Sequence, residues 1–251
     1  MSLLSVKNLR KSFGGNLAVD RASFDVKPGE LLALIGPNGA GKTTIFNMVG
    51  GQLPATRGSV KLDGTELLGL APRQIARLGV GRTFQIAAAF GSLTVLENIQ
   101  MAFLAHHRRI FSFWTPAAKQ YAERARRLLD QVGMADQAQR ACSELAYGDI
   151  KRIELAMALA IDPMLLLMDE PTAGMAPGER HELMALTRQL VQERNMAVLF
   201  TEHSMDVVFA YADRIIVLAR GQLVAEGSAD YIRQHPKVQE VYFGTGKAFG
   251  G

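Results

Sequence analysis

Hydrophobic and polar residues follow a period of two in the N-terminal part of the chain, which is typical of strands. The alternation is loose over residues 4–9 and regular over residues 23–27, where a Pro-Gly turn follows. Residues 31–35 are all apolar, as in a strand that is covered on both faces of its sheet. Residues 43–53 then show the period of a helix, and residues 60–64 predict a strand that enters a turn.

The helical period dominates the middle of the chain, from about residue 93 to residue 160. Within this region, Thr115 is expected to cap a helix that has Pro116 at its first position and ends at Gly133. One face of this helix is apolar and consists of Tyr121, Ala125, Leu128, Leu129 and Val132. We expect that face to pack against the rest of the protein.

Strands return in the last third of the chain. Residues 165–168 and 198–200 are short apolar runs, and a helix is expected between them. Residues 215–218 and 223–225 flank an Arg-Gly turn and predict a hairpin. The four glycines of residues 244–251 indicate a mobile tail. The whole pattern predicts an α/β core that is interrupted by a helical insertion and preceded by antiparallel strands.

Composition excludes several classes of protein. The chain has 251 residues, of which 48% are hydrophobic and 21% are charged, so a large core is possible and disorder as the main state is excluded. Cys142 is the only cysteine, which excludes a disulfide scaffold. The longest apolar run is residues 155–161, whereas a membrane-spanning helix needs roughly 20 residues. The net charge of +4 is compatible with an anionic ligand but too small to indicate DNA binding.

The clearest candidate for chemistry is the glycine-rich segment of residues 36–43, which matches the phosphate-loop pattern G-x-x-x-x-G-K-[ST] in full. It lies between a predicted buried strand and a predicted helix, as the pattern requires. Backbone N–H groups would hold the β-phosphate, Lys42 would reach the β- and γ-phosphates, and Thr43 would coordinate Mg²⁺. A glycine-rich turn without a ligand is the alternative, which this context disfavours. The segment predicts binding of a nucleoside triphosphate, and a kinase remains possible.

A second candidate is the pair of carboxylates that follows the apolar run at residues 165–168. Asp169 would hold Mg²⁺, directly or through a water molecule. Glu170 would accept a hydrogen bond from a water and aim that water at the γ-phosphate. A glutamate at a strand end is more often a solvated acid, but the phosphate loop in the same chain favours the catalytic interpretation.

Three further motifs make the sequence resemble the ATP-binding cassette (ABC) family over essentially its whole length. Residues 83–85 resemble the glutamine loop, residues 145–149 resemble the signature motif, and His203 resembles the switch histidine. The order of these motifs along the chain also fits the ABC family. A signature motif has no use in a kinase, so the kinase interpretation is removed. The resemblance implies an α/β fold, the P-loop NTPase cassette with a mixed central sheet, an N-terminal antiparallel β subdomain and a helical subdomain inserted at about residues 90–160. Residues 1–251 would form a single ATP-binding domain.

The resemblance also implies roles by position. Phe13 would stack on adenine, with packing in the core as the alternative, and Ala18 would line the same pocket. Gln85 would sense Mg²⁺ and the attacking water, and His203 would contact the γ-phosphate. The expected catalytic residues are Glu170, His203 and Gln85, and the expected Mg²⁺ ligands are Thr43, Gln85 and Asp169. The residues expected to bind ATP are Phe13, Ala18, Gly36, Asn38, Gly39, Ala40, Gly41, Lys42, Thr43, Thr44, Ala146, Gly148 and Asp149.

The same resemblance implies partners. Two cassettes would face each other head to tail, with ATP between the phosphate loop of one and the signature of the other, and residues 171–175 would cross the interface. The second cassette would be another copy or a different ATPase subunit. Two integral membrane permease subunits would receive the motion at the cytoplasmic face of the inner membrane, and a periplasmic or extracellular binding protein would take part indirectly. A soluble ABC ATPase that acts on ribosomes or DNA is the less favoured alternative, and we expect no nucleic acid partner.

Details of the motifs narrow the choice within the family. Residues 81–85, 145–149 and 238–244 look like those of the ATP-binding subunits of branched-chain amino acid importers. The basic and aromatic segment at residues 106–114 resembles an extended segment of that subunit, with a packed loop as the alternative. ATPases of lipopolysaccharide export and of urea or amide import are the alternative functions.

The signature departs from the common family pattern at two positions. Ala146 stands where serine is common, and Tyr147 stands where glycine is common. The missing hydroxyl would remove a hydrogen bond to the γ-phosphate of the opposite ATP, and such a bond to a charged group is worth about 1.5–3 kcal/mol. We therefore expect weaker coupling at the site that this signature completes.

Overall fold

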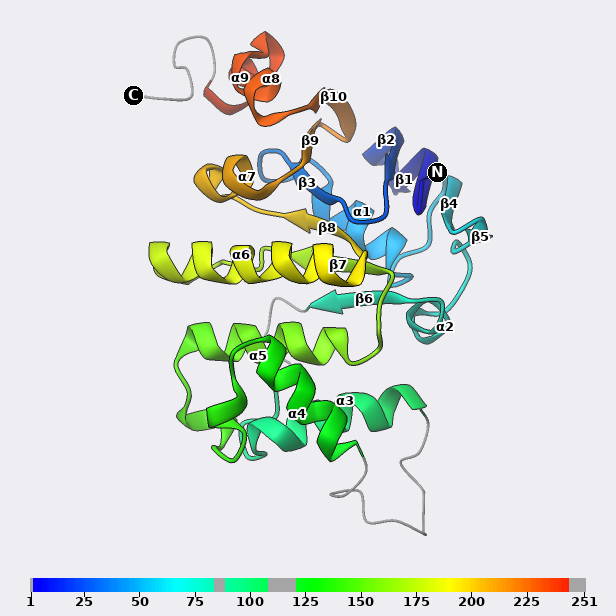
Figure 1. Cartoon of the computed structure of the whole chain (residues 1–251). Helices are drawn as coiled ribbons and strands as arrows, with labels where there is room; N and C mark the ends of the chain where they lie inside the picture. Colours follow the sequence, from blue (N-terminus) through cyan, green and yellow to red (C-terminus); the bar gives the residue numbers. More distant parts are fainter. Residues whose placement is uncertain (1, 84–88, 108–120, 244–251) are drawn as a thin grey trace.

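The computed structural model describes residues 2–83, 89–107 and 121–243, which form two sheets with helices around them (Figure 1). The strands are β1 (Leu4–Phe13), β2 (Asn16–Val26), β3 (Leu31–Ile35), β4 (Arg57–Leu62), β5 (Thr65–Glu66), β6 (Val80–Thr83), β7 (Leu165–Asp169), β8 (Ala197–Thr201), β9 (Arg214–Ala219) and β10 (Gln222–Gly227). The helices are α1 (Lys42–Val49), α2 (Pro72–Arg77), α3 (Val95–His107), α4 (Ala122–Gln131), α5 (Tyr147–Leu159), α6 (Pro177–Arg194), α7 (Met205–Tyr211), α8 (Ala229–Gln234) and α9 (Pro236–Phe243), and the short 3-10 turns are η2 (Ala135–Gln137) and η3 (Cys142–Glu144).

The larger sheet has its strands in the order β10-β9-β3-β8-β7-β6. Neighbouring strands are parallel except in the β9-β10 hairpin, so the sheet is mixed, as expected. β3, β7 and β8 are buried along their whole length, which explains their unbroken apolar sequences. Because parallel strands bring their carboxyl ends to one edge, the segments that follow β3, β7 and β8 meet there.

The smaller sheet is antiparallel and has the strand order β2-β1-β4-β5. It shares a hydrophobic core with α1 and with one face of the main sheet. Val26 of β2, Val60 of β4, Phe46 of α1 and Leu34 of β3 are all fully buried in this core. The antiparallel strands therefore support the helix that begins at the end of the phosphate loop.

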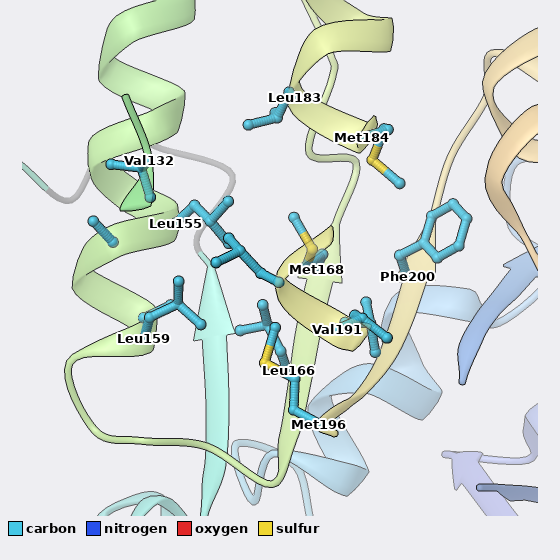
Figure 2. Packing of buried hydrophobic residues seen from close by; sticks show 14 of the residues in the cluster. Val132, Leu155, Leu159, Leu166, Met168, Leu183, Met184, Val191, Met196 and Phe200 are labelled. Carbon is cyan, nitrogen blue, oxygen red and sulfur yellow. The ribbon is translucent and has the colours of Figure 1, made fainter. Parts of the chain in front are cut away.

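The opposite face of the main sheet is covered by α5 and α6, as Figure 2 shows for the buried side chains. Leu166 and Met168 of β7 belong to this core, while Leu165 and Leu167 belong to the core on the other face. The helices contribute Leu155, Leu159, Leu183, Met184 and Val191. The four apolar residues of β7 are thus buried in one core or the other, which holds the carboxylates at the end of the strand in a fixed place.

The helix after the phosphate loop is shorter than the sequence pattern predicts. α1 ends at Val49 rather than at residue 53, because Gly50 closes the helix and Gly51 adopts a left-handed φ of 76°. α4 covers Ala122–Gln131, and the cap predicted at Thr115 lies outside the described residues, as does the proline after it. The predicted apolar face is confirmed, because Ala125, Leu128, Leu129 and Val132 are buried and Tyr121 is half-buried.

Several short elements have no clear sequence signal. β6, α2, α7, α8 and α9 are each eight residues or fewer, which is too short for a reliable period. α9 shows that residues 238–243 are helical. The tail expected at residues 244–251 lies outside the described residues, as do residues 108–114 of the basic and aromatic segment. In the part of the chain that the structure describes, no helix is long and apolar enough to cross a membrane.

Arg214 joins the two sheets near the start of β9. Its Nε donates to Oε1 of Glu30 at 2.8 Å, one terminal nitrogen donates to the backbone oxygen of Asp25 at 2.6 Å, and the other pairs with Glu226. The hydrogen bonds that Arg214 donates to Glu30 raise the pKa of Arg214, against the effect of burial. This clamp links β9 to the end of β2 and to β10.

We expect Arg214→Met to lower the free energy of unfolding by about 3 kcal/mol, because it leaves the buried Glu30 carboxylate without its charged partner. Urea unfolding followed by circular dichroism measures this loss. Arg10→Met is the matched control, since the pair of Arg10 with Asp20 is looser at 3.8 Å and more exposed. The control should change stability by less than about 0.5 kcal/mol, and equal losses for both variants would contradict the clamp.

Candidate functional site

The phosphate loop turns sharply after β3 and requires glycine at two positions. A Cβ on Gly36 would lie 2.1 Å from the backbone oxygen of Leu218, and a Cβ on Gly41 would lie 2.6 Å from the backbone oxygen of Ala18. Both glycines also have positive φ, 154° and 107°. The loop is therefore pressed against β9 and β2, and Ala18, which the family resemblance places near adenine, lies beside it.

Lys42 is the first residue of α1, and its ammonium folds back into the loop. Nζ donates to the backbone oxygen of Gly36 at 2.7 Å and to that of Pro37 at 3.2 Å. Burial lowers the pKa of Lys42, and the negative charges of Glu170 and Asp169 oppose that shift. The two predicted carboxylates are thus close enough to act on this ammonium. A phosphate group would take over the role of the two carbonyl oxygens.

Asp169 is held in place by the strands on either side of it. Thr201 of β8 donates from Oγ1 to Oδ1 of Asp169 at 2.7 Å. Arg82 of β6 lies on the other side, with a terminal nitrogen 3.6 Å from Oδ2. Arg82 also donates to Asn47 of α1 at 3.0 Å and to Gln52 at 2.9 Å. Burial lowers the pKa of Arg82, and Asp169 opposes that shift.

Glu170 and His203 form a pair at the edge of the sheet. Nε2 of His203 lies 3.0 Å from Oε1 of Glu170, and the imidazole is half exposed. The backbone N–H of Glu170 donates to Oγ1 and to the backbone oxygen of Thr201, both at 3.1 Å. Glu170 has a left-handed φ of 51°, a strained conformation of the kind found at active sites. Such a carboxylate can accept a proton from a water molecule, and the imidazole can hold the carboxylate in position.

A third carboxylate, Glu202, has no predicted role in the sequence beyond its place next to His203. Its side chain is buried, and Oε1 accepts hydrogen bonds from the backbone N–H of Thr172 at 2.8 Å and from its hydroxyl at 2.6 Å. Oε2 accepts from the backbone N–H of His203 at 3.0 Å. Glu202 therefore fixes the segment after Glu170 to the segment that carries His203. Neither periodicity nor spacing in the sequence points to this contact.

The signature residues lie at the start of α5. Ala146 is the N-cap and provides no side-chain cap, and Asp149 lies in the first turn. A Cβ on Gly148 would lie 3.1 Å from Oε1 of Glu179, so α5 begins against the start of α6. The loop between Glu170 and α6 runs beside this point.

Phe13 lies at the end of β1 with 49% of its surface exposed, so packing in the core, the alternative for this residue, is excluded. The ammonium of Lys11 lies 4.8 Å from the centre of its ring. The ring is available for stacking on a ligand. Gln85, the remaining catalytic candidate, lies outside the described residues.

Comparison with known proteins connects this arrangement to one family. Residues 19–173 match the family model described as ABC transporter. The high-affinity branched-chain amino acid transport ATP-binding protein LivG of Escherichia coli K12 is 40% identical over 252 residues, covering 96% of this chain and 98% of LivG. The ADP conformation of the ATP-binding cassette MJ1267 is 32% identical with a TM-score of 0.88, covering 97% of this chain and 99% of that cassette. The dimeric cassette MJ0796 bound to ADP and Pi is 25% identical with a TM-score of 0.76, covering 90% of this chain and 98% of that one.

We expect Glu170→Gln to keep ATP binding and to lower the ATP turnover number by at least about a hundredfold, because an amide cannot take the proton of the attacking water. Turnover is measured by phosphate release, and binding by a fluorescent ATP analogue. Glu182→Gln is the control, since Glu182 is exposed and pairs with Arg152 at 2.8 Å. Turnover of Glu170→Gln near the unmodified rate would exclude Glu170 as the base.

Glu202→Gln should lower turnover by about 10- to 100-fold, because a shift of about 1 Å in a reacting group has effects of this size. The amide nitrogen would face the backbone N–H of His203, so the loop after Glu170 would move relative to the histidine. ATP affinity should change by less than about twofold, since the hydrogen bonds of Glu202 go to the segments of Thr172 and His203. A variant with weaker ATP binding and unchanged turnover would contradict a positioning role.

Proposed function

This chain belongs to the ABC transporter family, and we propose that it powers the import of branched-chain amino acids as the ATP-hydrolysing subunit of an importer. Membership of the family gives ATP hydrolysis that is coupled to transport. The substrate class is supported by the similarity to LivG, which extends over nearly the whole of both chains. The observation that carries the enzymatic part is the 3.0 Å contact between Glu170 and His203, at the sheet edge where the phosphate loop begins.

Hydrolysis requires a water molecule in line with the γ-phosphate. We assign the phosphates to the loop of residues 36–43, where backbone N–H groups and the ammonium of Lys42 meet them. Glu170 would accept a proton from the attacking water, and His203 would hold the Glu170 carboxylate while it contacts the γ-phosphate. Adenine would stack on the exposed ring of Phe13.

The site also suits Mg²⁺, which prefers oxygen ligands. Asp169 offers a carboxylate whose orientation is fixed by Thr201, and Thr43 offers an exposed hydroxyl in the first turn of α1. Among the described residues, no group of three or more His, Cys, Asp or Glu side chains could hold a metal alone, so nucleotide phosphates would complete the coordination. Bound Mg²⁺ would neutralise charge on the phosphates, and the family resemblance adds Gln85 as a ligand.

The partners that we propose follow from family membership and from the dimeric state of the cassette MJ0796. A second cassette would place its signature over the ATP on this chain, while Ala146, Gly148 and Asp149 of this chain would complete the opposite site. Two permease subunits would receive the resulting motion at the cytoplasmic face of the inner membrane. A substrate-binding protein outside the cytoplasm would supply the amino acid.

Deletion of the gene from its own host should abolish the ATP-driven uptake of radiolabelled leucine, isoleucine and valine at micromolar concentrations. The unmodified gene should restore uptake, and the Glu170→Gln gene should not, because binding without hydrolysis stops the cycle. Labelled urea serves as the comparison substrate. Loss of urea uptake with normal leucine uptake would favour the amide importer, and loss of neither would overturn the import proposal.

A further inference from the structure

We propose that Tyr147 is a positioning residue that couples the two nucleotide sites of the cassette dimer. It would transmit changes from the loop after Glu170 to the signature at the start of α5. The inference rests on the proposed function, because it needs one ATP at the phosphate loop and a second at the signature. Tyr147 is the first residue of α5, where glycine is common in the family, so the contact arises from a feature of this chain.

The ring of Tyr147 lies over Gly174, in the loop between Glu170 and α6. A Cβ on Gly174 would lie 3.4 Å from Cε1 and 3.7 Å from the hydroxyl oxygen of Tyr147. Gly174 has a positive φ of 80°, a conformation that side chains other than glycine rarely adopt. The absence of a side chain at this position therefore lets the aromatic ring pack directly on the backbone of the loop.

The ring also lies close to Lys151, one helical turn further along α5. Nζ of Lys151 lies 5.3 Å from the centre of the Tyr147 ring and 3.0 Å from Oε2 of Glu154. Both members of this ion pair are buried, so the ammonium has little freedom to move. A cation over an aromatic face is attracted by the ring, more strongly where water is excluded. The ring is therefore fixed to α5 although 45% of the residue remains exposed.

The loop under the ring is fixed in turn to the catalytic pair. The backbone N–H of Ala173, next to Gly174, donates to the backbone oxygen of Glu170 at 3.1 Å. Thr172 is bound by Glu202, which also binds the backbone of His203. A change at Glu170 or His203 thus reaches Gly174 through short contacts, and it reaches the start of α5 through Tyr147.

This connection would link two different ATP molecules. Glu170 and His203 serve the nucleotide on the phosphate loop of the same chain, whereas Gly148 and Asp149 would serve the nucleotide of the opposite cassette. A contact whose geometry depends on both nucleotide sites couples their binding free energies. Binding at either site then changes the affinity of the other by the same factor. Tyr147 would therefore make occupancy of one site alter the signature that completes the other.

Hydrogen–deuterium exchange on the full-length chain tests this coupling without a second cassette. The measurement uses a concentration at which light scattering shows a single chain, so that no opposite ATP touches the signature. In the unmodified chain, MgATP should slow exchange in peptides that cover residues 36–43 and also in peptides that cover residues 147–155. In Tyr147→Ala, the slowing over residues 147–155 should be about two- to fivefold weaker, as loss of a half-exposed aromatic side chain and its cation–π contact implies.

Two further variants separate coupling from a general effect on structure. Tyr147→Phe keeps the ring over Gly174 and beside Lys151, so it should retain the response of the unmodified chain. Tyr231→Ala is the matched control: Tyr231 is 52% exposed, lies near the start of α8, and packs over Gly227 at the opposite end of the molecule (Figure 1). It should also retain the full response over residues 147–155.

The possible outcomes distinguish the coupling from the proposed function. Slowing at residues 36–43 without slowing at residues 147–155 in the unmodified chain would overturn the coupling. A full response in Tyr147→Ala, or an equal loss in Tyr231→Ala, would also overturn it. If MgATP slowed no exchange at residues 36–43, nucleotide binding by the phosphate loop would be wrong, and the proposed function would fail with it.

Discussion

The parallel pairing of β8 with both β3 and β7 is the constraint on which the site depends. Three segments far apart in the sequence meet because these strands end at one edge: the phosphate loop, the acidic pair and His203. Thr201 shows the consequence most directly, since it lies at the end of β8 and donates to Asp169 at the end of β7. Cores on both faces prevent a shift in strand register, and a shift of one residue would reverse the direction of every side chain in the strand.

Charged groups at this edge remain buried because each one meets a fixed partner. Lys42 donates to two carbonyl oxygens, Asp169 lies between Thr201 and Arg82, and Glu202 accepts three hydrogen bonds at 3.0 Å or less. Buried charge without such partners is very unfavourable. The lowered pKa values of Lys42 and Arg82 reflect this burial. A nucleotide with its own charges would therefore enter a site whose dipoles are already oriented.

The sequence predicts much of this arrangement, and it fails where contacts are non-local. The α/β core and the antiparallel N-terminal strands follow from periodicity, and the phosphate loop, Asp169 and Glu170 follow from motif. The mixed sheet and the role of His203 are instead what the resemblance to the ABC family implies. The predicted end of α1 is wrong. Residues 51–53 continue the helical pattern of the sequence, but the backbone conformation of the glycines after Val49 ends the helix. Glu202 is missed because its importance comes from Thr172, 30 residues away in the sequence. Short elements such as β6 depend on neighbouring strands rather than on a pattern of their own.

The two departures in the signature have opposite effects on its contacts. Ala146 lacks a hydrogen-bond donor to a ligand, whereas Tyr147 adds a contact within the chain. Ala146 leaves the first turn of α5 without a side-chain cap. The backbone N–H groups of that turn, at the positive end of the helix dipole, can therefore bind a phosphate. The carboxylate of Asp149 in the same turn lowers that positive potential. The backbone N–H groups alone therefore bind a phosphate more weakly than they would together with a serine hydroxyl. Tyr147 adds a contact that glycine cannot make, with Gly174 of the loop after Glu170. A signature with fewer hydrogen-bond donors to its ligand but a firmer contact with the loop after Glu170 would depend more on communication between sites than on phosphate affinity.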